Sequence, residues 1–138
     1  MAWSQIDEPA RGPSSAELRA RVDDCRALQH SRGREAGFRT NAEIPDEALD
    51  RLVRASADAR RLLGAAVEGM GLSARAARRL LRVARTVADL AQEEETGSRA
   101  LAEALSYRAT ELGSASGAEL PEAAVSRQVR ASRTRRGV

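Results

Sequence analysis

The clearest structural pattern in the chain lies in residues 71–90, GLSARAARRLLRVARTVADL. On a helix of about 100° per residue, its charged residues fall on one side and its aliphatic residues fall on the other. The charged side holds Arg75, Arg78, Arg79, Arg82, Arg85 and Asp89. The aliphatic side holds Ala77, Leu80, Leu81, Ala84, Val87, Ala88 and Ala91. This division predicts an amphipathic helix over residues 74–92, with one face on a core and a guanidinium face toward water or an anion.

Arg75 differs from the other arginines because it falls in the first turn of this helix. Ser73 occupies the expected N-cap position, so Arg75 lies beside unpaired backbone N–H groups and the positive end of the helix dipole. A cation there is unfavourable by roughly a few tenths of a kcal/mol unless an anion joins it. Phosphate suits a site that combines free N–H donors with a guanidinium group. Arg75 is therefore the candidate anion-binding residue.

The remaining arginines of the same side form a candidate anion or nucleic-acid face. Its members are Arg78, Arg79, Arg82 and Arg85. A row of guanidinium groups can follow a phosphate backbone, but an arginine-rich helix face is often only solvated. The sequence leaves both interpretations open for each of these residues.

Two further helices are predicted before this stretch. Residues 14–17, SSAE, form a capping-box pattern that opens a helix to about Gln29. Its expected buried face holds Leu18, Val22, Cys25 and Leu28. Residues 31–44 should form a loop anchored by Phe38, and Pro45 suits the first position of a short helix through Leu49, Leu52 and Val53.

Two more helices complete the predicted set. Ser56 caps one that Gly71 ends, and Gly97-Ser98 begin the other. The first should bury Leu62, Leu63, Ala66, Val67 and Met70, and the second Leu101, Ala104, Leu105 and Tyr107.

Composition agrees with an all-α fold. The chain has 138 residues, of which 42% are hydrophobic and only 2% aromatic, so its core must consist of Leu, Val and Ala. Such a core suits close helix packing, and no stretch alternates with the period of a strand. We expect an all-α bundle of about five helices over residues 14–110. A disordered N-terminal segment (1–13) and a disordered Arg-rich tail (111–138) should flank it.

The sequence offers no set of catalytic or metal-binding residues. The single histidine, His30, falls at a predicted helix end, and the lone Cys25 lies in register with core positions. Glu93-Glu94-Glu95 lack ligand spacing and suit a solvated turn. Neither GxxxxGK[ST] nor GxGxxG occurs. We therefore expect no catalytic residues, no metal and no bound cofactor, so that the chain alone is not an enzyme.

Charge and hydropathy limit the partners. All 23 basic residues are Arg, and the net charge of +3 permits phosphate or nucleic-acid binding without requiring it. No segment approaches the roughly 20 apolar residues of a membrane span. These features predict a cytoplasmic protein without a membrane partner.

Four segments of the chain occur in the order of a known family. They are SSAELRARV (14–22), TNAEI (40–44), the 71–90 stretch and ALAEALSYR (100–108). Together they resemble the C-terminal domain of magnesium-chelatase-like AAA+ ATPases, and most closely the ComM/YifB branch. The resemblance covers about residues 11–108. It implies a helical lid over nucleotide that a preceding domain binds, with Arg75 as the sensor-2 arginine reaching the ATP γ-phosphate.

The resemblance also implies partners. ATP and Mg²⁺ would bind only with a P-loop ATPase core domain, and relatives of this kind assemble as rings. The ComM branch implies DNA processing, and the chelatase branch implies magnesium insertion into a porphyrin. The Walker A and Walker B motifs of the family do not occur in these 138 residues. We therefore expect a truncated or split reading frame that encodes the lid alone, with the core encoded upstream.

Three functional hypotheses follow. The first is a detached lid domain that senses ATP through Arg75 without catalysing its hydrolysis. The alternative is a small nucleic-acid-binding protein that uses the arginine face and the basic tail, although it lacks aromatic residues for base stacking. The third is a relic reading frame without a selected function.

Overall fold

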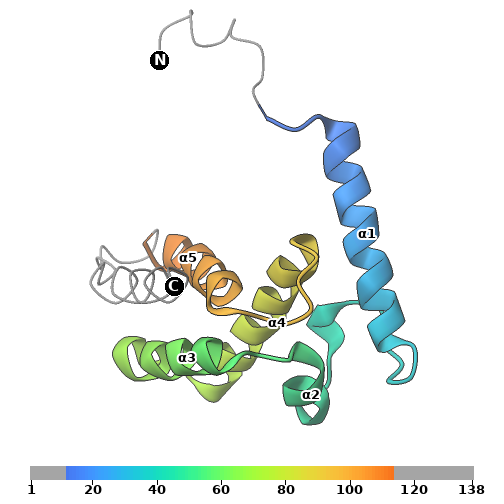
Figure 1. The fold of residues 1–138 in the computed structure, drawn as a ribbon. Helices are drawn as coiled ribbons and strands as arrows, with labels where there is room; N and C mark the ends of the chain where they lie inside the picture. The colour runs from blue at the N-terminus through green and yellow to red at the C-terminus, as the bar shows by residue number, and fades with distance from the viewer. Residues whose placement is uncertain (1–11, 114–138) are drawn as a thin grey trace, which may run out of the picture.

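The computed structural model describes residues 12–113, which form five α-helices and two short 3₁₀-helices without a β-sheet (Figure 1). The elements are α1 (Ser15–Gly33), η2 (Asn41–Glu43), η3 (Asp46–Ala48), α2 (Leu49–Val53), α3 (Ala57–Met70), α4 (Ala74–Leu90) and α5 (Ser98–Gly113). The predicted all-α class is confirmed. The segments predicted to be disordered lie outside the described residues, except for residues 12–13 and the last turn of α5. Every helix in the described part is too short or too polar to cross a bilayer.

Serine side chains begin three of these helices, as their sequences predict. At α1, Ser14 Oγ accepts from the Glu17 amide at 3.2 Å, and the Glu17 carboxylate accepts from the Ser14 amide at 2.6 Å. Ser56 and Ser73 cap α3 and α4 in the same way, each at 3.1 Å from an amide N–H in the first turn. Gly71 ends α3 with φ +64°, a conformation that favours glycine. The local sequence therefore fixes where α4 begins.

The main core lies between α3, α4 and α5. Small side chains let these helices approach closely, and Ala84 and Leu101 are fully buried there. The buried set is Ala59, Leu62, Ala66, Leu72, Leu80, Ala84, Leu101 and Ala104. Tyr107 was expected to face inward, but it is 55% exposed and its hydroxyl donates to Glu103 Oε1 at 2.6 Å. A tyrosine so placed contributes little to the core.

A second cluster connects the loop after α1 to α4. It consists of Phe38, Ile44, Ala48, Leu49 and Val53, with Leu81 packed against it. The expected loop anchor, Phe38, is therefore confirmed. The segment between α2 and α3 pairs with the segment before α5 through two backbone hydrogen bonds. The Ser56 amide donates to the Thr96 carbonyl, and the Thr96 amide donates to the Arg54 carbonyl, both at 3.0 Å. The apolar cluster packs the segment from Phe38 to Val53, which includes η2 and η3, against Leu81 of α4.

Helix α1 departs from its expected packing. Leu18, Val22 and Leu28 were predicted to be buried, but they are 46%, 48% and 42% exposed. Its buried residues, Cys25, Gln29 and Gly33, all lie in its C-terminal half. Figure 1 shows α1 standing apart from α3 and α5. The apolar side chains of α1 are few among many charged ones, so the helix is only weakly amphipathic, and no described element buries Leu18, Val22 or Leu28.

Candidate functional site

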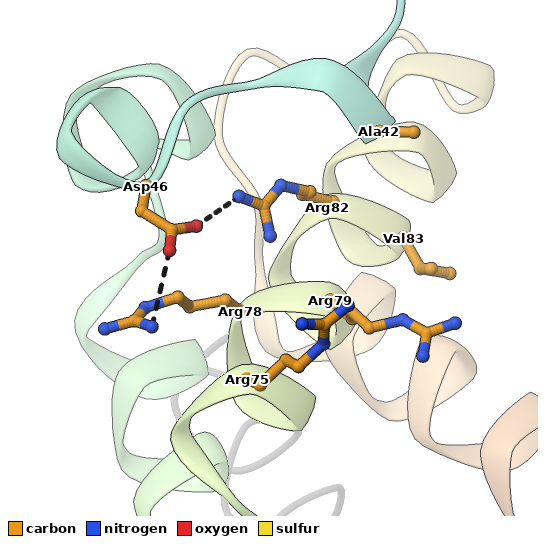
Figure 2. Close-up of a pocket in the computed structure, with 7 residues that line it drawn as sticks. All are labelled: Ala42, Asp46, Arg75, Arg78, Arg79, Arg82 and Val83. Atoms are coloured by element: carbon orange, nitrogen blue, oxygen red, sulfur yellow. Dashed lines mark hydrogen bonds and ion pairs between the residues drawn. The ribbon is translucent and has the colours of Figure 1, made fainter.

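Four of the five candidate arginines line one surface pocket of about 510 Å³ (Figure 2). One wall is α4, and the other is the chain around η2 and η3. The lining residues are Ala42, Asp46, Arg75, Arg78, Arg79, Arg82 and Val83. With four guanidinium groups and one carboxylate, the pocket attracts anions.

Asp46 engages two of these arginines. Arg82 Nη2 lies 2.5 Å from Asp46 Oδ1, and its Nε and Nη2 also donate to the Ile44 carbonyl at 3.1 and 2.8 Å. Arg78 Nη1 lies 3.3 Å from Asp46 Oδ2. The hydrogen bond from Arg82 is the main reason why the pKa of Asp46 is below its ordinary value. The Asp46 carboxylate therefore stays charged and holds both arginines against the pocket wall.

Arg75 and Arg79 are the unpaired cations of the pocket. Both side chains are exposed, and no described residue forms a hydrogen bond or ion pair with either. Arg75 lies in the first turn of α4, as the sequence predicts, and Arg79 follows one turn later. In Figure 2, Arg79 extends away from Asp46. These two guanidinium groups are free to meet an external anion.

Arg85 does not belong to the exposed face, so this part of the prediction is wrong. Its side chain is 2% exposed. Its guanidinium donates to the carbonyl oxygens of Glu93 at 2.5 Å, Glu94 at 2.9 Å and Val53 at 3.3 Å. The turn after α4 keeps the side chains of Glu94 and Glu95 exposed, as the sequence suggested, but its backbone also supplies two of these three carbonyl acceptors. Burial lowers the pKa of Arg85, while the nearby charge of Asp89 opposes that change.

Asp89 is also buried, at the centre of a polar network that the sequence did not reveal. Arg32 donates to both of its oxygens, at 2.6 and 2.8 Å, in a bidentate pair. Asn41 Nδ2 donates to Asp89 Oδ2 at 2.8 Å, and Arg85 Nε donates to Oδ1 at 3.1 Å. The network joins α1, η2 and α4. The i,i+4 spacing of Arg85 and Asp89 was the available signal, but the same spacing occurs on solvated faces.

The residues that the sequence excluded from catalysis have ordinary surroundings. Cys25 is buried and accepts a hydrogen bond from Gln29 Nε2 at 3.2 Å, which confirms its interpretation as a small core residue. His30 is exposed in the last turn of α1. Glu93 pairs with Arg99 at 2.9 Å. Within residues 12–113, no group of three or more His, Cys, Asp and Glu is arranged to hold a metal.

Comparisons with known proteins identify relatives of this chain. It is 42% identical over 101 residues to an uncharacterized protein of Mycobacterium tuberculosis. The matched region covers 73% of this chain and 20% of that protein. It is 38% identical over 99 residues to competence protein ComM of Haemophilus influenzae, covering 72% of this chain and 19% of ComM. It is 34% identical over 100 residues to the uncharacterized protein YifB of Salmonella typhimurium, and the match covers 72% of this chain and 19% of YifB.

The chain thus spans about a fifth of the length of these relatives. No solved structure matches it. The family model described as "Magnesium chelatase, subunit ChlI C-terminal" matches residues 12–108, which include α1, the arginine pocket and most of α5. The chain therefore belongs to this family of magnesium-chelatase C-terminal domains, together with the corresponding part of ComM and YifB.

Proposed function

We propose that this chain serves as the helical lid of a ComM/YifB-type AAA+ ATPase, in which Arg75 contacts the terminal phosphate of ATP. A P-loop core domain would bind the nucleotide and its Mg²⁺. The chain alone would sense the nucleotide without hydrolysing it. Assembly into rings, DNA processing and a cytoplasmic location would come with that core.

The observation that carries this proposal is the position of Arg75. Its guanidinium lies in the first turn of α4, exposed and without an ion pair among the described residues. The serine cap takes one first-turn amide, and the helix dipole adds positive potential at the same end. An arginine kept free in this way can stabilise the charge that develops on a transferring phosphoryl group.

The buried network supports the same proposal by keeping α4 in place. Asp89 and Arg85 attach the C-terminal end of α4 to the turn that follows, and Arg32 attaches it to α1. Arg75 thus projects from the serine-capped first turn of a helix whose C-terminal end this network holds in place. Such rigidity is what a phosphate-contacting residue needs to meet its ligand at a fixed place.

Complementation of a lid-deleted relative tests the proposal. The chain is mixed with a ComM-type ATPase from which the C-terminal domain has been removed, and ATP hydrolysis is measured. We expect the wild-type chain to stimulate turnover, and Arg75→Ala to reduce that stimulation at least about tenfold because the phosphate loses its charged donor. Arg75→Lys should restore it only in part, since an ammonium group lacks the planar fork of guanidinium.

The matched control is Arg61→Ala on α3. Arg61 is also exposed, and its one ion pair among residues 12–113 is with Asp58 at 2.7 Å, so its loss should leave the stimulation unchanged. Stimulation that survives Arg75→Ala, or a wild-type chain that does not stimulate at all, would exclude Arg75 as the nucleotide sensor.

Nucleic-acid binding is the second candidate, and the structure offers it fewer residues than the sequence did. Arg85 is buried, and Asp46 engages Arg78 and Arg82. Exposed Arg75 and Arg79 remain on α4. A gel-shift series from low to physiological salt distinguishes this function, since binding through phosphate contacts weakens steeply with salt. No retardation at low salt would remove it.

A further inference from the structure

Asp46 is the one carboxylate among the residues that line the arginine pocket, and it divides the four arginines into two pairs. Arg78 and Arg82 contact it at 3.3 and 2.5 Å. Arg75 and Arg79 contact no described residue through an ion pair or hydrogen bond. Arg78 and Arg79 are neighbours in the sequence, yet only one of them is neutralised. Asp46 therefore pairs directly with Arg78 and Arg82, whereas it acts on Arg75 only as a nearby charge that belongs to the same pocket.

The two free arginines are spaced for a ligand with more than one phosphate. They are four residues apart on α4, which places them on the same face with a rise of about 6 Å between their Cα atoms. Both line the same pocket, and their long side chains can converge on an anion within it. A single phosphate would occupy one guanidinium fork, whereas a polyphosphate chain would engage both.

We propose that Arg75 and Arg79 form a two-arginine site for the polyphosphate group of a nucleotide, and that Asp46 is a built-in counter-anion that withholds Arg78 and Arg82 from it. Arg79 is thereby a second phosphate-contacting residue. The identification of the ligand as a nucleotide rests on the proposed function. The division of the arginines rests on the pocket geometry alone.

Asp46 does not hold its two arginines equally. Arg82 also donates twice to the Ile44 carbonyl, and only 15% of its side chain is exposed. Arg78 has no described partner other than Asp46, and 48% of its side chain is exposed. Neutralising Asp46 would therefore release Arg78 toward the ligand and leave Arg82 anchored. This asymmetry gives the proposal a specific signature.

Titration of the full 138-residue chain with inorganic tripolyphosphate tests it. Amide and arginine side-chain NMR signals at low salt report the affinity of each variant. We expect Arg75→Ala and Arg79→Ala each to weaken binding about tenfold, the size of one charge-assisted contact. Arg61→Ala on α3, outside the pocket, is the control and should leave the affinity unchanged, and Arg78→Ala, whose guanidinium pairs with Asp46, should weaken binding less than Arg79→Ala does.

Two variants of Asp46 test the counter-anion. Asp46→Asn keeps the size and the acceptor oxygen but removes the charge, so we expect tripolyphosphate to bind about five times more tightly. That gain should become smaller in the double variant Asp46→Asn with Arg78→Ala, because Arg78 is the arginine that is released, while the loss of the Asp46 charge near Arg75 is common to both variants. Circular dichroism melts of all variants check that each still folds.

Several results would overturn the proposal. They are wild-type affinity in Arg79→Ala, equal losses for Arg78→Ala and Arg79→Ala, an unchanged affinity in Asp46→Asn, and no binding of tripolyphosphate by the wild-type chain at low salt. A thymidine oligonucleotide that binds more tightly than tripolyphosphate would overturn the ligand class. If the tripolyphosphate titrations give the expected affinities but the chain does not stimulate the lid-deleted ATPase, the lid function is rejected and the pocket assignment stands. If the chain stimulates the ATPase through Arg75 but the titrations fail, only the two-arginine site is rejected.

Discussion

At the centre of the fold, the Asp89 carboxylate faces two guanidinium groups. Arg32 donates to it at 2.6 and 2.8 Å, and Arg85 donates at 3.1 Å. Because Asp89 and Arg85 are almost fully buried, water cannot replace either partner. We expect Asp89→Ala to lower the free energy of unfolding by about 3–5 kcal/mol, since it leaves Arg85 buried without its counter-ion. Urea denaturation measures this loss.

An exposed ion pair provides the comparison. Asp58 pairs with Arg61 at 2.7 Å, and more than half of each side chain is exposed. Asp58→Ala should change the free energy of unfolding by less than about 1 kcal/mol, because both charges stay hydrated. Similar losses for Asp89→Ala and Asp58→Ala would contradict the central role of the Asp89 network.

The same carboxylate predicts a pH dependence of stability. Burial alone would raise the pKa of Asp89, but hydrogen bonds from Arg32 and Asn41 and the charge of Arg85 outweigh it and hold the pKa below its ordinary value. A depressed pKa in the folded state stabilises the fold above the unfolded value, near about pH 4. That contribution is lost as the pH falls through the lower, folded pKa. Urea unfolding between about pH 6 and 3 should therefore show an acid-dependent loss that Asp89→Asn removes in part.

The sequence alone predicted the exposed position of Arg75 but not the burial of Arg85 on the same helix. The first-turn position of Arg75 follows from Ser73 and the 3.6-residue period, and the structure agrees with it. The burial of Arg85 does not follow from the same pattern. A helical wheel gives the direction of a side chain, but not whether solvent or a ring of backbone carbonyls lies there. The acceptors for Arg85 come from Glu93 and Glu94, whose charged side chains suggested an exposed turn.

At the scale of elements, two glycines in helices have opposite surroundings. A Cβ atom on Gly33 would lie 1.9 Å from the Phe38 carbonyl oxygen, because the chain turns back over the end of α1 there. On Gly64, in the middle of α3, it would meet nothing within 4 Å. We expect Gly33→Ala to destabilise the protein by about 1–3 kcal/mol through overpacking. Gly64→Ala should stabilise it by roughly 0.5–1 kcal/mol, since alanine favours a helix interior.

Thermal melts of the two variants check this contrast. The melting temperature should fall for Gly33→Ala and rise for Gly64→Ala. A melting temperature that does not fall for Gly33→Ala would mean that Phe38 and the end of α1 are not packed as described.

The elements themselves were largely predictable because their ends carry local signals. Ser14, Ser56 and Ser73 each accept a first-turn amide as their sequences predict, and Gly71 takes the left-handed conformation expected at a helix end. Local chemistry of this kind needs no knowledge of the tertiary fold. The packing of each helix does need it, which is why the apolar side of α1 was wrongly expected to be buried.

At the scale of the whole molecule, α1 is joined to the bundle at one end only. Cys25, Gln29 and Gly33 are buried in its C-terminal half, and Arg32 forms the bidentate pair with Asp89 on α4. Its N-terminal half has the capping box of Ser14 and Glu17, but none of residues 15–24 is buried in the described part of the chain. Most helical stability in proteins comes from packing of an apolar face. The two halves of α1 should therefore differ in local stability.

Hydrogen exchange on the full chain measures this difference. Amides in residues 18–24 should exchange on the order of 100-fold faster than those in residues 80–88 of α4, because opening the unpacked half of α1 exposes little buried surface. Substituting both Leu18 and Val22 with serine should leave the melting temperature nearly unchanged, whereas Leu101→Ala in the core should cost about 2–5 kcal/mol. Equal protection of the two helices, or a large loss from the double serine variant, would mean that another part of the chain covers α1. The exposed apolar side would then be an internal contact and would not be available to a partner domain.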